Sequence, residues 1–367
     1  MNEVVKTDVV LIGAGPIGLE IAVALKHAGI DYIHLEARQL GHTISWFPRQ
    51  AHFFSSPERI AICGVPLITV DQSKATREEY LAYLLGIVQQ FGLSIRSYER
   101  VTRLSVQENG RFFLETERAA GSRSYSAAKV IVAIGDMHGP RPLTHDGVAT
   151  VPGCDLSHVS SYFVEPHPFS GQDLMIVGGK NSAVEAAIRC YRAGARVTLC
   201  HRQPELASSV KYWLKPEIEW LIKAGHVRQL SSRVPVEITP TTVRVAPVDL
   251  NLRPDSDRDH RESIPADFVL LLIGYEMDPS LLKQAGVELY GPGRTPRFNP
   301  QTMQTNTPGL YVAGTAAAGT QLGFKLFIEN CHAHVVRILR DLTGQDPVHL
   351  NPLGFSLLDY HPMPAES

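Results

Sequence analysis

The sequence predicts an α/β protein with two Rossmann-like domains, one inserted into the other. A strand, a glycine-rich turn, a helix and a second strand follow one another in residues 9–37, and the same order returns in residues 173–202. This repeat indicates two separate dinucleotide-binding folds rather than one large sheet. The length of 367 residues agrees with two domains, because it exceeds the size at which a single hydrophobic core stops growing.

Two stretches rich in Pro and Gly mark the expected domain boundaries. YFVEPHPFSG at 162–171 lies between the two repeats, and YGPGRTPRFNP at 290–300 precedes a late strand, GLYVAG. We therefore expect a discontinuous first domain, residues 1–165 and 293–367, that holds the second domain, residues 166–292, as an insertion.

The charge balance excludes several classes of partner. Lys and Arg number 35 against 37 Asp and Glu, which gives a net charge of −2 and no electrostatic case for binding nucleic acid or an anionic membrane surface. No apolar run reaches the roughly 18 residues of a membrane span, and the N-terminus enters a strand without a signal-peptide pattern. We expect a cytoplasmic protein.

The cysteines predict neither a disulfide framework nor a metal site. There are five, an odd number, widely spaced and without a CxxC pair. They are Cys63, Cys154, Cys190, Cys200 and Cys331.

The first glycine turn, GAGPIG, predicts a site for a dinucleotide. Gly13 permits the tight turn, Gly15 lets backbone amides approach a pyrophosphate, and Gly18 lets the helix pack on the strand. Glu36, at the end of the second strand, is the expected carboxylate for a ribose diol. Because a carboxylate disfavours a 2′-phosphate, the turn suits FAD or NAD but not NADP.

The C-terminal segment TNTPGLYVAGTAAAG, residues 305–319, favours FAD. In flavoproteins with two dinucleotide sites, a late strand ends in Ala-Gly-Asp, and the acid binds the ribitol chain of the flavin. Here the strand ends Ala313-Gly314-Thr315, and the Thr315 hydroxyl can still donate or accept a hydrogen bond. The alternative is a plain buried strand.

The second glycine turn, VGGKNSAVEAA, departs from the usual pattern. Gly178 and Ala183 occupy its first and third positions, but Lys180 occupies the second. The ammonium group of a lysine can lie along the phosphates of a dinucleotide. The alternative is that this turn binds nothing.

The residues after the next strand favour NADPH over NADH at the second turn. Where an acid would bind the ribose of NADH, the chain has His201 and Arg202, followed by Lys211 and Lys215. A cation in this place is typical of 2′-phosphate recognition. The strand LLLIGYEMD would close the domain, with Gly274 near the nicotinamide. FAD at one site and NADPH at the other imply hydride transfer from the nicotinamide to the flavin.

Several segments resemble one family, the bacillithiol-disulfide reductases, which are relatives of low-molecular-weight thioredoxin reductases. The matching segments are GAGPIGLE, HFFSSPERIAICGVP, YFVEPHPF, GGKNSAVEAA, SVKYWLKPEIE, LLIGYEMD, LYVAGTAAAG and FIEN. The resemblance covers almost the whole chain. It implies a homodimer, and an oxidised low-molecular-weight thiol as the electron acceptor.

The motifs and the resemblance together predict two sets of cofactor-binding residues. The FAD set is Gly13, Gly15, Pro16, Ile17, Gly18, Glu36, Ser45, Trp46, Phe54, Ser55, Ser56, Gly135, Gly314 and Thr315. The NADPH set is Gly178, Gly179, Lys180, Asn181, Ser182, Ala183, His201, Arg202, Lys211 and Gly274.

One residue departs from the family pattern at a position that bears on the chemistry. Many members carry a cysteine where this chain has Ile17, and a thiolate there, at a helix N-terminus, would attack a disulfide. Isoleucine cannot, so no catalytic residue is predicted. Cys63 and Cys331 are redox candidates near the expected flavin edge, whereas Cys190 and Cys200 are expected to be inert packing residues.

Three other functions remain open at this point. A reductase that passes single electrons to a ferredoxin or flavodoxin would need no thiol. A flavin monooxygenase shares the two-site architecture, but its FxGxxxHxxxW fingerprint is only half present, with Met175 and Gly179 in the His and Trp positions. A redox sensor that binds the cofactors without turnover is the third.

Overall fold

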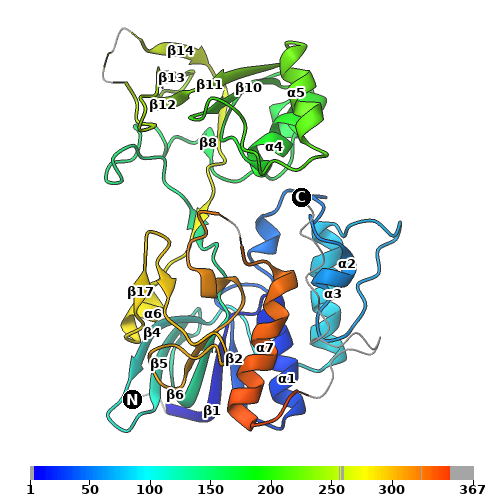
Figure 1. Ribbon diagram of the computed structural model, residues 1–367, viewed down its shortest axis with the longest axis vertical. Helices are drawn as coiled ribbons and strands as arrows, with labels where there is room; N and C mark the ends of the chain where they lie inside the picture. The colour runs from blue at the N-terminus through cyan, green and yellow to red at the C-terminus, as the bar shows by residue number, and fades with distance from the viewer. Residues whose placement is uncertain (1–3, 256, 258–259, 324, 348–367) are drawn as a thin grey trace. The chain divides into compact units, whose positions relative to one another are not determined.

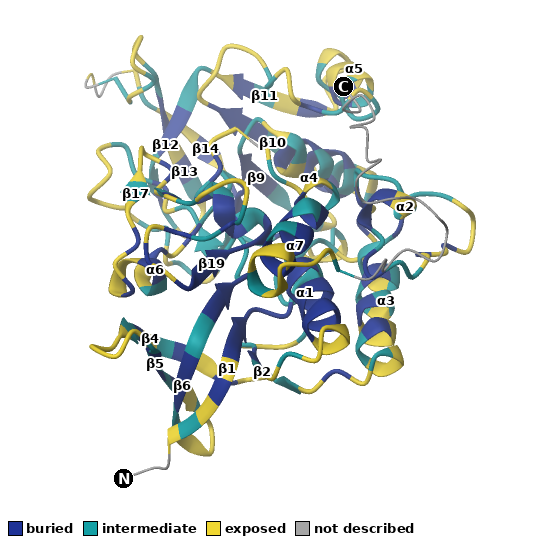
Figure 2. Cartoon of the chain, turned by 60° about the horizontal axis from the view of Figure 1, so that its bottom comes forward, coloured by how far each residue is buried: buried dark blue, intermediate teal, exposed yellow. Residues whose placement is uncertain are grey.

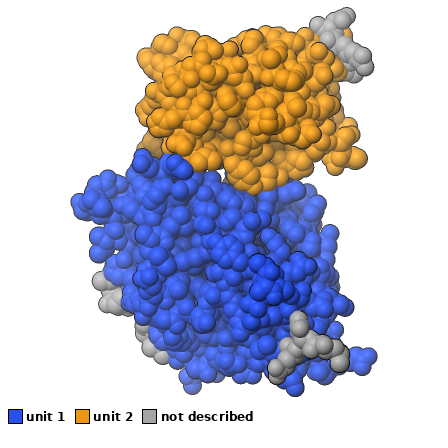
Figure 3. All heavy atoms as spheres, turned by 180° about the vertical axis from the view of Figure 1, so that it is seen from behind, with its two compact units in different colours: residues 1–139, 275–366 blue, residues 140–274, 367 orange. Residues whose placement is uncertain are grey.

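A computed structural model describes residues 4–255, 257, 260–323 and 325–347 (Figure 1). The chain forms two compact units, coloured separately in Figure 3. Unit 1 contains the described residues up to Gly139 and from Tyr275 onward, and unit 2 runs from Pro140 to Gly274. Unit 2 is therefore an insertion in unit 1.

Unit 1 is built on a seven-stranded sheet. Its strands are β3 (Ile95–Arg96), β2 (Tyr32–Leu35), β1 (Val4–Ile12), β6 (Gly121–Val132), β5 (Phe112–Arg118), β4 (Arg100–Val106) and β19 (Leu310–Val312). Strands β3, β2, β1, β6 and β19 are parallel, whereas β4, β5 and β6 form an antiparallel meander. The register sets Ile12 and Val312 on either side of Val132, so three strands end at one edge.

Helices α1 (Pro16–His27) and α7 (Ile328–Thr343) lie side by side against this sheet (Figures 1 and 2). Helix α1 begins with a proline at its first position, which suits a residue whose missing N–H would have no helical partner. Nine successive residues of α1 are buried, and all of them except Glu20 are apolar or glycine. The remaining helical and short strand elements are α2 (Pro57–Ile60), α3 (Arg77–Gln90), α6 (Ser280–Gln284), η1 (Ile44–Trp46), η3 (Gly314–Ala318), β16 (Tyr275–Glu276), β17 (Leu289–Tyr290) and β18 (Thr295–Pro296).

Unit 2 contains a five-stranded parallel sheet in the order β11 (Val227–Ser231), β10 (Arg196–His201), β9 (Asp173–Val177), β15 (Phe268–Leu271) and β8 (Val159–Ser160). Leu174 and Ile176 of β9 share one core with α4 (Asn181–Arg192) and α5 (Lys215–Lys223). Met175 and Val177 share the other with an antiparallel sheet of β12 (Arg233–Ile238), β13 (Thr242–Pro247) and β14 (Glu262–Pro265). Both faces of the parallel sheet are covered, which accounts for its almost continuous apolar strands. Element η2 (His167–Phe169) also lies in unit 2, and β7 (Gly139–Pro140) lies where the chain first passes between the units.

The unit boundaries differ from the predicted ones at 165/166 and 292/293. Residues 140–165 belong to unit 2, because β8 pairs with β15 and Phe163 is buried in the core of α4. Residues 275–292 belong to unit 1, because Leu282 is buried in its core and the Gln284 side chain accepts a hydrogen bond from the Leu104 amide at 3.0 Å. The stretches rich in Pro and Gly are therefore internal turns rather than domain boundaries. The part of the predicted range 293–367 beyond residue 347 lies outside the described residues.

Candidate functional site

The first glycine turn is shaped as a cradle with one open position. A Cβ on Gly13, which has φ +106°, would lie 2.4 Å from the Ala133 carbonyl oxygen. A Cβ on Gly18 would lie 2.0 Å from the Gly13 carbonyl oxygen. A Cβ on Gly15, by contrast, would meet no atom within 4 Å. Gly13 and Gly18 are therefore required by packing, and Gly15 leaves room for a ligand at the N-terminus of α1, which fits a dinucleotide pyrophosphate.

Glu36 lies directly against this turn. One carboxylate oxygen accepts a hydrogen bond from the Ala14 amide at 2.8 Å, and the other accepts from the Arg38 amide at 2.7 Å. Each oxygen keeps capacity for a further donor. The arrangement fits a ribose diol beside the pyrophosphate cradle.

The late strand β19 brings the predicted Gly314 and Thr315 to the same edge of the sheet. The Ala313 amide donates to the Val132 carbonyl at 2.9 Å, which joins the end of β19 to the end of β6. A Cβ on Gly135 would lie 3.7 Å from the Thr315 hydroxyl oxygen. A Cβ on Gly314 would lie 3.4 Å from the Ile17 Cβ. Residues from β1, β6 and β19 are thus assembled at one place, although more than 290 positions of sequence separate Ile17 from Gly314.

A loop that carries Ser45 and Trp46 is fastened to the first turn. The Gly41 amide donates to the Ala14 carbonyl at 3.1 Å, and η1 follows. The Trp46 indole donates to His42 Nε2 at 3.2 Å, and its ring stacks on Tyr275 with 5.8 Å between centroids. Neither His42 nor Tyr275 was expected from the sequence.

Phe54, Ser55 and Ser56 lie just before α2. The Phe54 carbonyl accepts a hydrogen bond from the Lys74 ammonium at 2.5 Å, and the Ser56 hydroxyl donates to Glu58 at 2.6 Å. Their assignment to a flavin site rests on the resemblance.

The second turn, in unit 2, is also packed against neighbouring backbone and side chains. A Cβ on Gly178 would lie 2.5 Å from the Leu272 carbonyl oxygen and 2.9 Å from the Ala183 Cβ. A Cβ on Gly179 would lie 3.2 Å from the His201 Cβ, so the predicted His201 contacts this turn. Lys180 precedes the first turn of α4 with extended backbone and an exposed side chain. Lys180 is thereby located at the N-terminus of a helix, where phosphates bind.

Asn181 fastens a second segment beside this turn. Its side-chain oxygen accepts from the Lys211 amide at 2.9 Å, and its side-chain nitrogen donates to the Ser209 carbonyl at 3.2 Å. The Ala207 amide also donates to the Gly179 carbonyl at 3.0 Å. The structure therefore brings Lys211 to the turn, which sequence spacing alone left open. Ser182 and Arg202 are exposed, and Gly274, with φ +100°, accepts a hydrogen bond from the Arg141 amide at 2.9 Å.

Every cysteine is unpaired and poorly suited to form a thiolate. Burial raises the pKa of Cys63, and burial together with nearby Asp136 and Glu20 raises the pKa of Cys331 to about 12. Burial also raises the pKa of Cys190 and of Cys200 to about 12, and both lie in the cores of unit 2, which confirms their expected packing role. The half-buried Cys154 has a raised pKa as well. Among the described residues no group of His, Cys, Asp and Glu could hold a metal ion.

A buried ion pair joins α1 to α7. His332 Nδ1 lies 2.8 Å from a Glu20 carboxylate oxygen, and His332 Nε2 lies 3.1 Å from the Arg59 carbonyl oxygen. Burial alone would lower the pKa of His332, but Glu20 reverses the shift and raises that pKa to about 9. The His332 ring is therefore protonated at neutral pH, and the sequence showed no sign of this pair.

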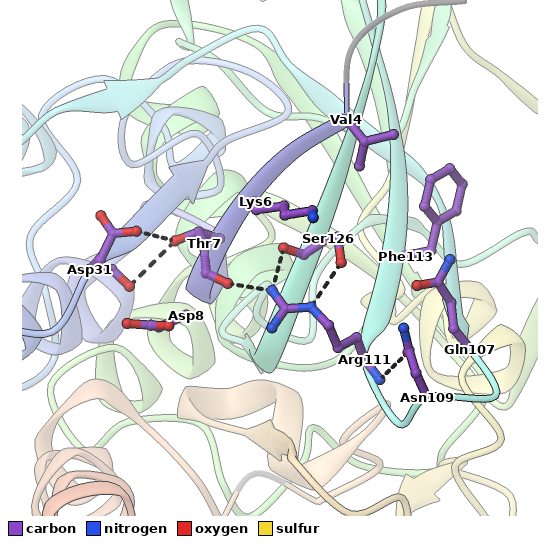
Figure 4. Close-up of a pocket in the computed structure, with 10 residues that line it drawn as sticks. All are labelled: Val4, Lys6, Thr7, Asp8, Asp31, Gln107, Asn109, Arg111, Phe113 and Ser126. Carbon is purple, nitrogen blue, oxygen red and sulfur yellow. Dashed lines mark hydrogen bonds between the residues drawn. The ribbon is translucent and has the colours of Figure 1, made fainter.

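A separate hollow lies at the opposite end of β1 from the glycine turn (Figure 4). The Arg111 guanidinium lies in it, donating to the Thr7 carbonyl at 2.9 Å and to the Ser126 hydroxyl at 3.0 Å. The Thr7 hydroxyl, on the same wall, donates to an Asp31 carboxylate oxygen at 2.9 Å. This hollow is not part of the candidate dinucleotide site.

Two glycine turns, one joining β1 to α1 and the other joining β9 to α4, define a protein of the two-dinucleotide oxidoreductase class. The chain belongs to the pyridine nucleotide-disulphide oxidoreductase family, whose model matches residues 10–314. It is an NADPH-dependent flavoprotein oxidoreductase, and its cofactors are FAD and NADPH. The fold class expected from the sequence is thereby confirmed. Among the described residues, no helix is long and apolar enough to cross a membrane.

Three relatives are informative. The chain is 32% identical over 342 residues to the bacilliredoxin reductase Bdr of Bacillus subtilis (strain 168), with 93% of this chain and 99% of the relative covered. The solved structure of the bacillithiol disulfide reductase Bdr from Bacillus cereus is 32% identical, with a TM-score of 0.83, and 92% of this chain and 98% of that chain are covered. A ferredoxin–NADP reductase of Ignicoccus hospitalis is 25% identical over 339 residues, covering 87% of this chain and 97% of the relative.

Proposed function

We propose that this chain reduces a low-molecular-weight disulfide of the bacillithiol type, with electrons taken from NADPH and passed through FAD. The observation that carries the proposal is the likeness, over almost the full length of both chains, to the Bdr protein of Bacillus cereus, which is named for that substrate. The balanced reaction consumes one NADPH and one proton and yields NADP⁺ and two thiols per disulfide.

We further propose where FAD binds. Its pyrophosphate would lie over Gly15, and a ribose diol would bind Glu36, whose carboxylate is already oriented by two amides. The remainder would extend toward Gly135, Gly314 and Thr315. Ser45 and Trp46, with the segment 54–56 and the backbone at 16–17, complete the proposed set. FAD supplies the two-electron chemistry, while these residues bind and orient it.

NADPH would occupy the second turn. The backbone of residues 178–183 would face the pyrophosphate, and Lys180 would neutralise part of its charge. Arg202 and Lys211 would bind the 2′-phosphate. His201 would pack against the turn at Gly179. Gly274 would lie on the nicotinamide side.

Anaerobic assay of the purified holoprotein tests the substrate. We expect NADPH oxidation that depends on added bacillithiol disulfide and that releases two thiols per NADPH. Glutathione disulfide, cystine and a reaction without acceptor are the controls. Equal rates in all four reactions, or NADPH oxidation without thiol release, would exclude the proposed substrate.

A second candidate function is reduction of a ferredoxin or flavodoxin. Ile17 and the buried cysteines favour it, because single-electron transfer needs no protein thiol. The likeness to a ferredoxin–NADP reductase also supports it, at lower identity. This function would be supported if the holoprotein reduced ferredoxin with NADPH and showed no activity on disulfides. The monooxygenase alternative is weakened by Met175, which takes the place of the fingerprint histidine and is fully buried in β9.

We also propose a cytoplasmic homodimer, as the resemblance implies. Five unpaired cysteines suit a reducing compartment. Sedimentation equilibrium of the holoprotein measures the assembly, and a mass of one 40.4 kDa chain at micromolar concentration would refute the dimer.

A further inference from the structure

We propose that His34 is a positioning residue of the first glycine turn, holding the Gly13–Ala14 peptide in the orientation that leaves Gly15 open to the FAD pyrophosphate. The inference rests on the proposed FAD site of unit 1. His34 belongs to none of the sites predicted from the sequence, where it reads as one residue of the strand YIHL.

The side chain of His34 reaches the turn directly. It lies on β2, only 1% of it is exposed, and its Nε2 is 2.9 Å from the Gly13 carbonyl oxygen. A carbonyl oxygen can only accept, so Nε2 carries the hydrogen. The other ring nitrogen, Nδ1, is buried without a hydrogen-bond partner. Burial lowers the pKa of His34 to about 4, so the ring is neutral at physiological pH.

Strand β2 and the residue that directly follows it, Glu36, hold one peptide unit from both sides. The Gly13 carbonyl and the Ala14 N–H belong to the same planar peptide. His34 donates to that carbonyl, and Glu36 accepts from that N–H at 2.8 Å. Side chains two residues apart on a strand lie on the same face, which lets both reach the peptide. Between them, the Leu35 carbonyl accepts from the Gly13 amide at 2.8 Å. Rotation of this peptide would break the hydrogen bonds of both side chains.

The orientation of this peptide decides the shape of the cradle. The Gly13 oxygen, which His34 binds, is the atom that a Cβ on Gly18 would meet at 2.0 Å. Rotation of the peptide would therefore disturb the start of α1 as well as the turn. Amide groups bind a phosphate well when they are already aimed at it, because no ordering is then needed on binding.

The cost of a buried histidine supports a role for it. A fully buried position on a strand favours an aliphatic side chain, and the unpaired Nδ1 of His34 carries a desolvation penalty. The hydrogen bond to Gly13 is the one favourable polar contact that the described structure gives this ring. An aliphatic side chain at this position would avoid the penalty but could not bind the Gly13 carbonyl.

Two substitutions separate the hydrogen bond from packing. His34→Leu keeps a side chain of comparable bulk but removes the donor, and His34→Gln keeps an N–H donor of similar reach. His334→Leu is the matched control, because His334 is also a buried histidine with an unpaired Nδ1, and it lies on α7. Each protein is stripped of flavin and titrated with FAD, and the dissociation constant is measured from flavin fluorescence. NADP⁺ binding to unit 2 and the far-ultraviolet circular dichroism spectrum report folding.

We expect His34→Leu to weaken FAD binding by roughly tenfold or more, as expected for an unsatisfied buried carbonyl. His34→Gln and His334→Leu should stay within about threefold of the parent, since that difference is below 1 kcal/mol. An unchanged constant for His34→Leu, or equal losses in the Leu and Gln variants, would overturn the inference. If His34→Leu does not fold, the Gln variant decides: loss of FAD binding by folded His34→Gln refutes it. A parent chain that binds no FAD would show instead that the proposed FAD site is wrong.

Discussion

The side chain of Ile17 packs against Gly314, so that a Cβ on Gly314 would lie 3.4 Å from the Ile17 Cβ. Ile17 is in the first turn of α1, and Gly314 directly follows β19. Only 6% of Ile17 is exposed. The position at which the family resemblance implies a cysteine is thus an apolar packing position here, next to the proposed flavin site.

Substitution of Ile17→Cys should create a reactive thiol. The new sulfur would lie at the N-terminus of α1, where the helix dipole lowers a thiol pKa. The smaller side chain should lower the free energy of unfolding by about 1–2 kcal/mol. Native titration with a disulfide reagent should detect one more fast-reacting thiol per chain than in the parent. Ile17→Val is the control, and an unchanged thiol count in Ile17→Cys would contradict the assignment of position 17 to the site.

Loss of either unit 1 thiol should leave catalysis intact. Cys63→Ser and Cys331→Ser each remove a buried thiol with a raised pKa, which is not a nucleophile at neutral pH. We expect flavin reduction by NADPH and acceptor turnover within about twofold of the parent, and stability lower by about 1 kcal/mol. Stopped-flow absorbance and steady-state rates measure the two steps. Loss of acceptor turnover in only one of the variants would identify that cysteine as catalytic.

Substitutions of Gly15 and of Gly18, two glycines of the first turn, should have different effects. Gly15→Ala places a methyl group in open space, and its backbone (φ −79°) suits alanine, so the apoprotein should unfold at nearly the parent temperature. FAD binding should weaken by roughly tenfold or more, because the methyl group occupies the pyrophosphate position. Gly18→Ala should instead lower the free energy of unfolding by about 3 kcal/mol through overlap with the Gly13 carbonyl. Denaturant unfolding of both apoproteins and FAD titrations measure this contrast. An unchanged FAD affinity in Gly15→Ala would refute the proposal that the pyrophosphate lies over Gly15.

NADPH should reduce the bound flavin faster than NADH, and Arg202 should account for much of the difference. Removing a charged partner of a phosphate costs about 1.5–3 kcal/mol, so Arg202→Ala should raise the dissociation constant for NADPH by roughly 10- to 100-fold. Binding of NADH, which lacks the 2′-phosphate, should change little. Arg192→Ala is the matched control, since Arg192 lies on α4 and pairs with Glu217 at 2.6 Å. Faster flavin reduction by NADH than by NADPH in the parent protein would refute the proposal that Arg202 binds the 2′-phosphate.

Stability should fall as the pH rises from 6.5 toward 9. Folded His332 keeps its proton up to a pKa of about 9, against 6.5 in the unfolded chain, so the folded state binds more protons across this window. The contribution is complete below pH 6.5, is lost as the pH rises through 9, and amounts to about 3 kcal/mol. Other charged or titratable groups near this pair are Arg59, Glu329, His334, Cys63, Cys331, Tyr80 and Tyr83.

Urea unfolding of the parent and of His332→Gln at several pH values measures this contribution. The variant should be less stable than the parent at pH 6.5, because it leaves the Glu20 carboxylate buried without its cation. Its free energy of unfolding should also no longer fall as the pH rises from 6.5 toward 9. A slope that persists in His332→Gln would assign the effect to another group. At the acid side, His34 and His334 have a pKa lowered to about 4, so stability should also fall as the pH drops from 6.5 toward 4.

The two folds, the two turns and the classes of cofactor could be predicted from the sequence. The reason is that these features depend on local backbone requirements. Gly13 must have positive φ, and a side chain on Gly18 would strike the Gly13 carbonyl, so residue type alone marks the turn. Glu36 could also be found, because a short strand places it at a constant distance from the turn.

The domain boundaries and the partners of buried groups became known only from the three-dimensional fold. His34 and Gly13, Glu20 and His332, and Ile17 and Gly314 meet across separate segments that fold side by side. Their pairing depends on which faces of distant strands and helices are buried together. The hydrophobic periodicity of a short segment does not predict such long-range contacts. The same holds for residues 140–165, which join unit 2 because β8 finds its hydrogen-bonding partner there.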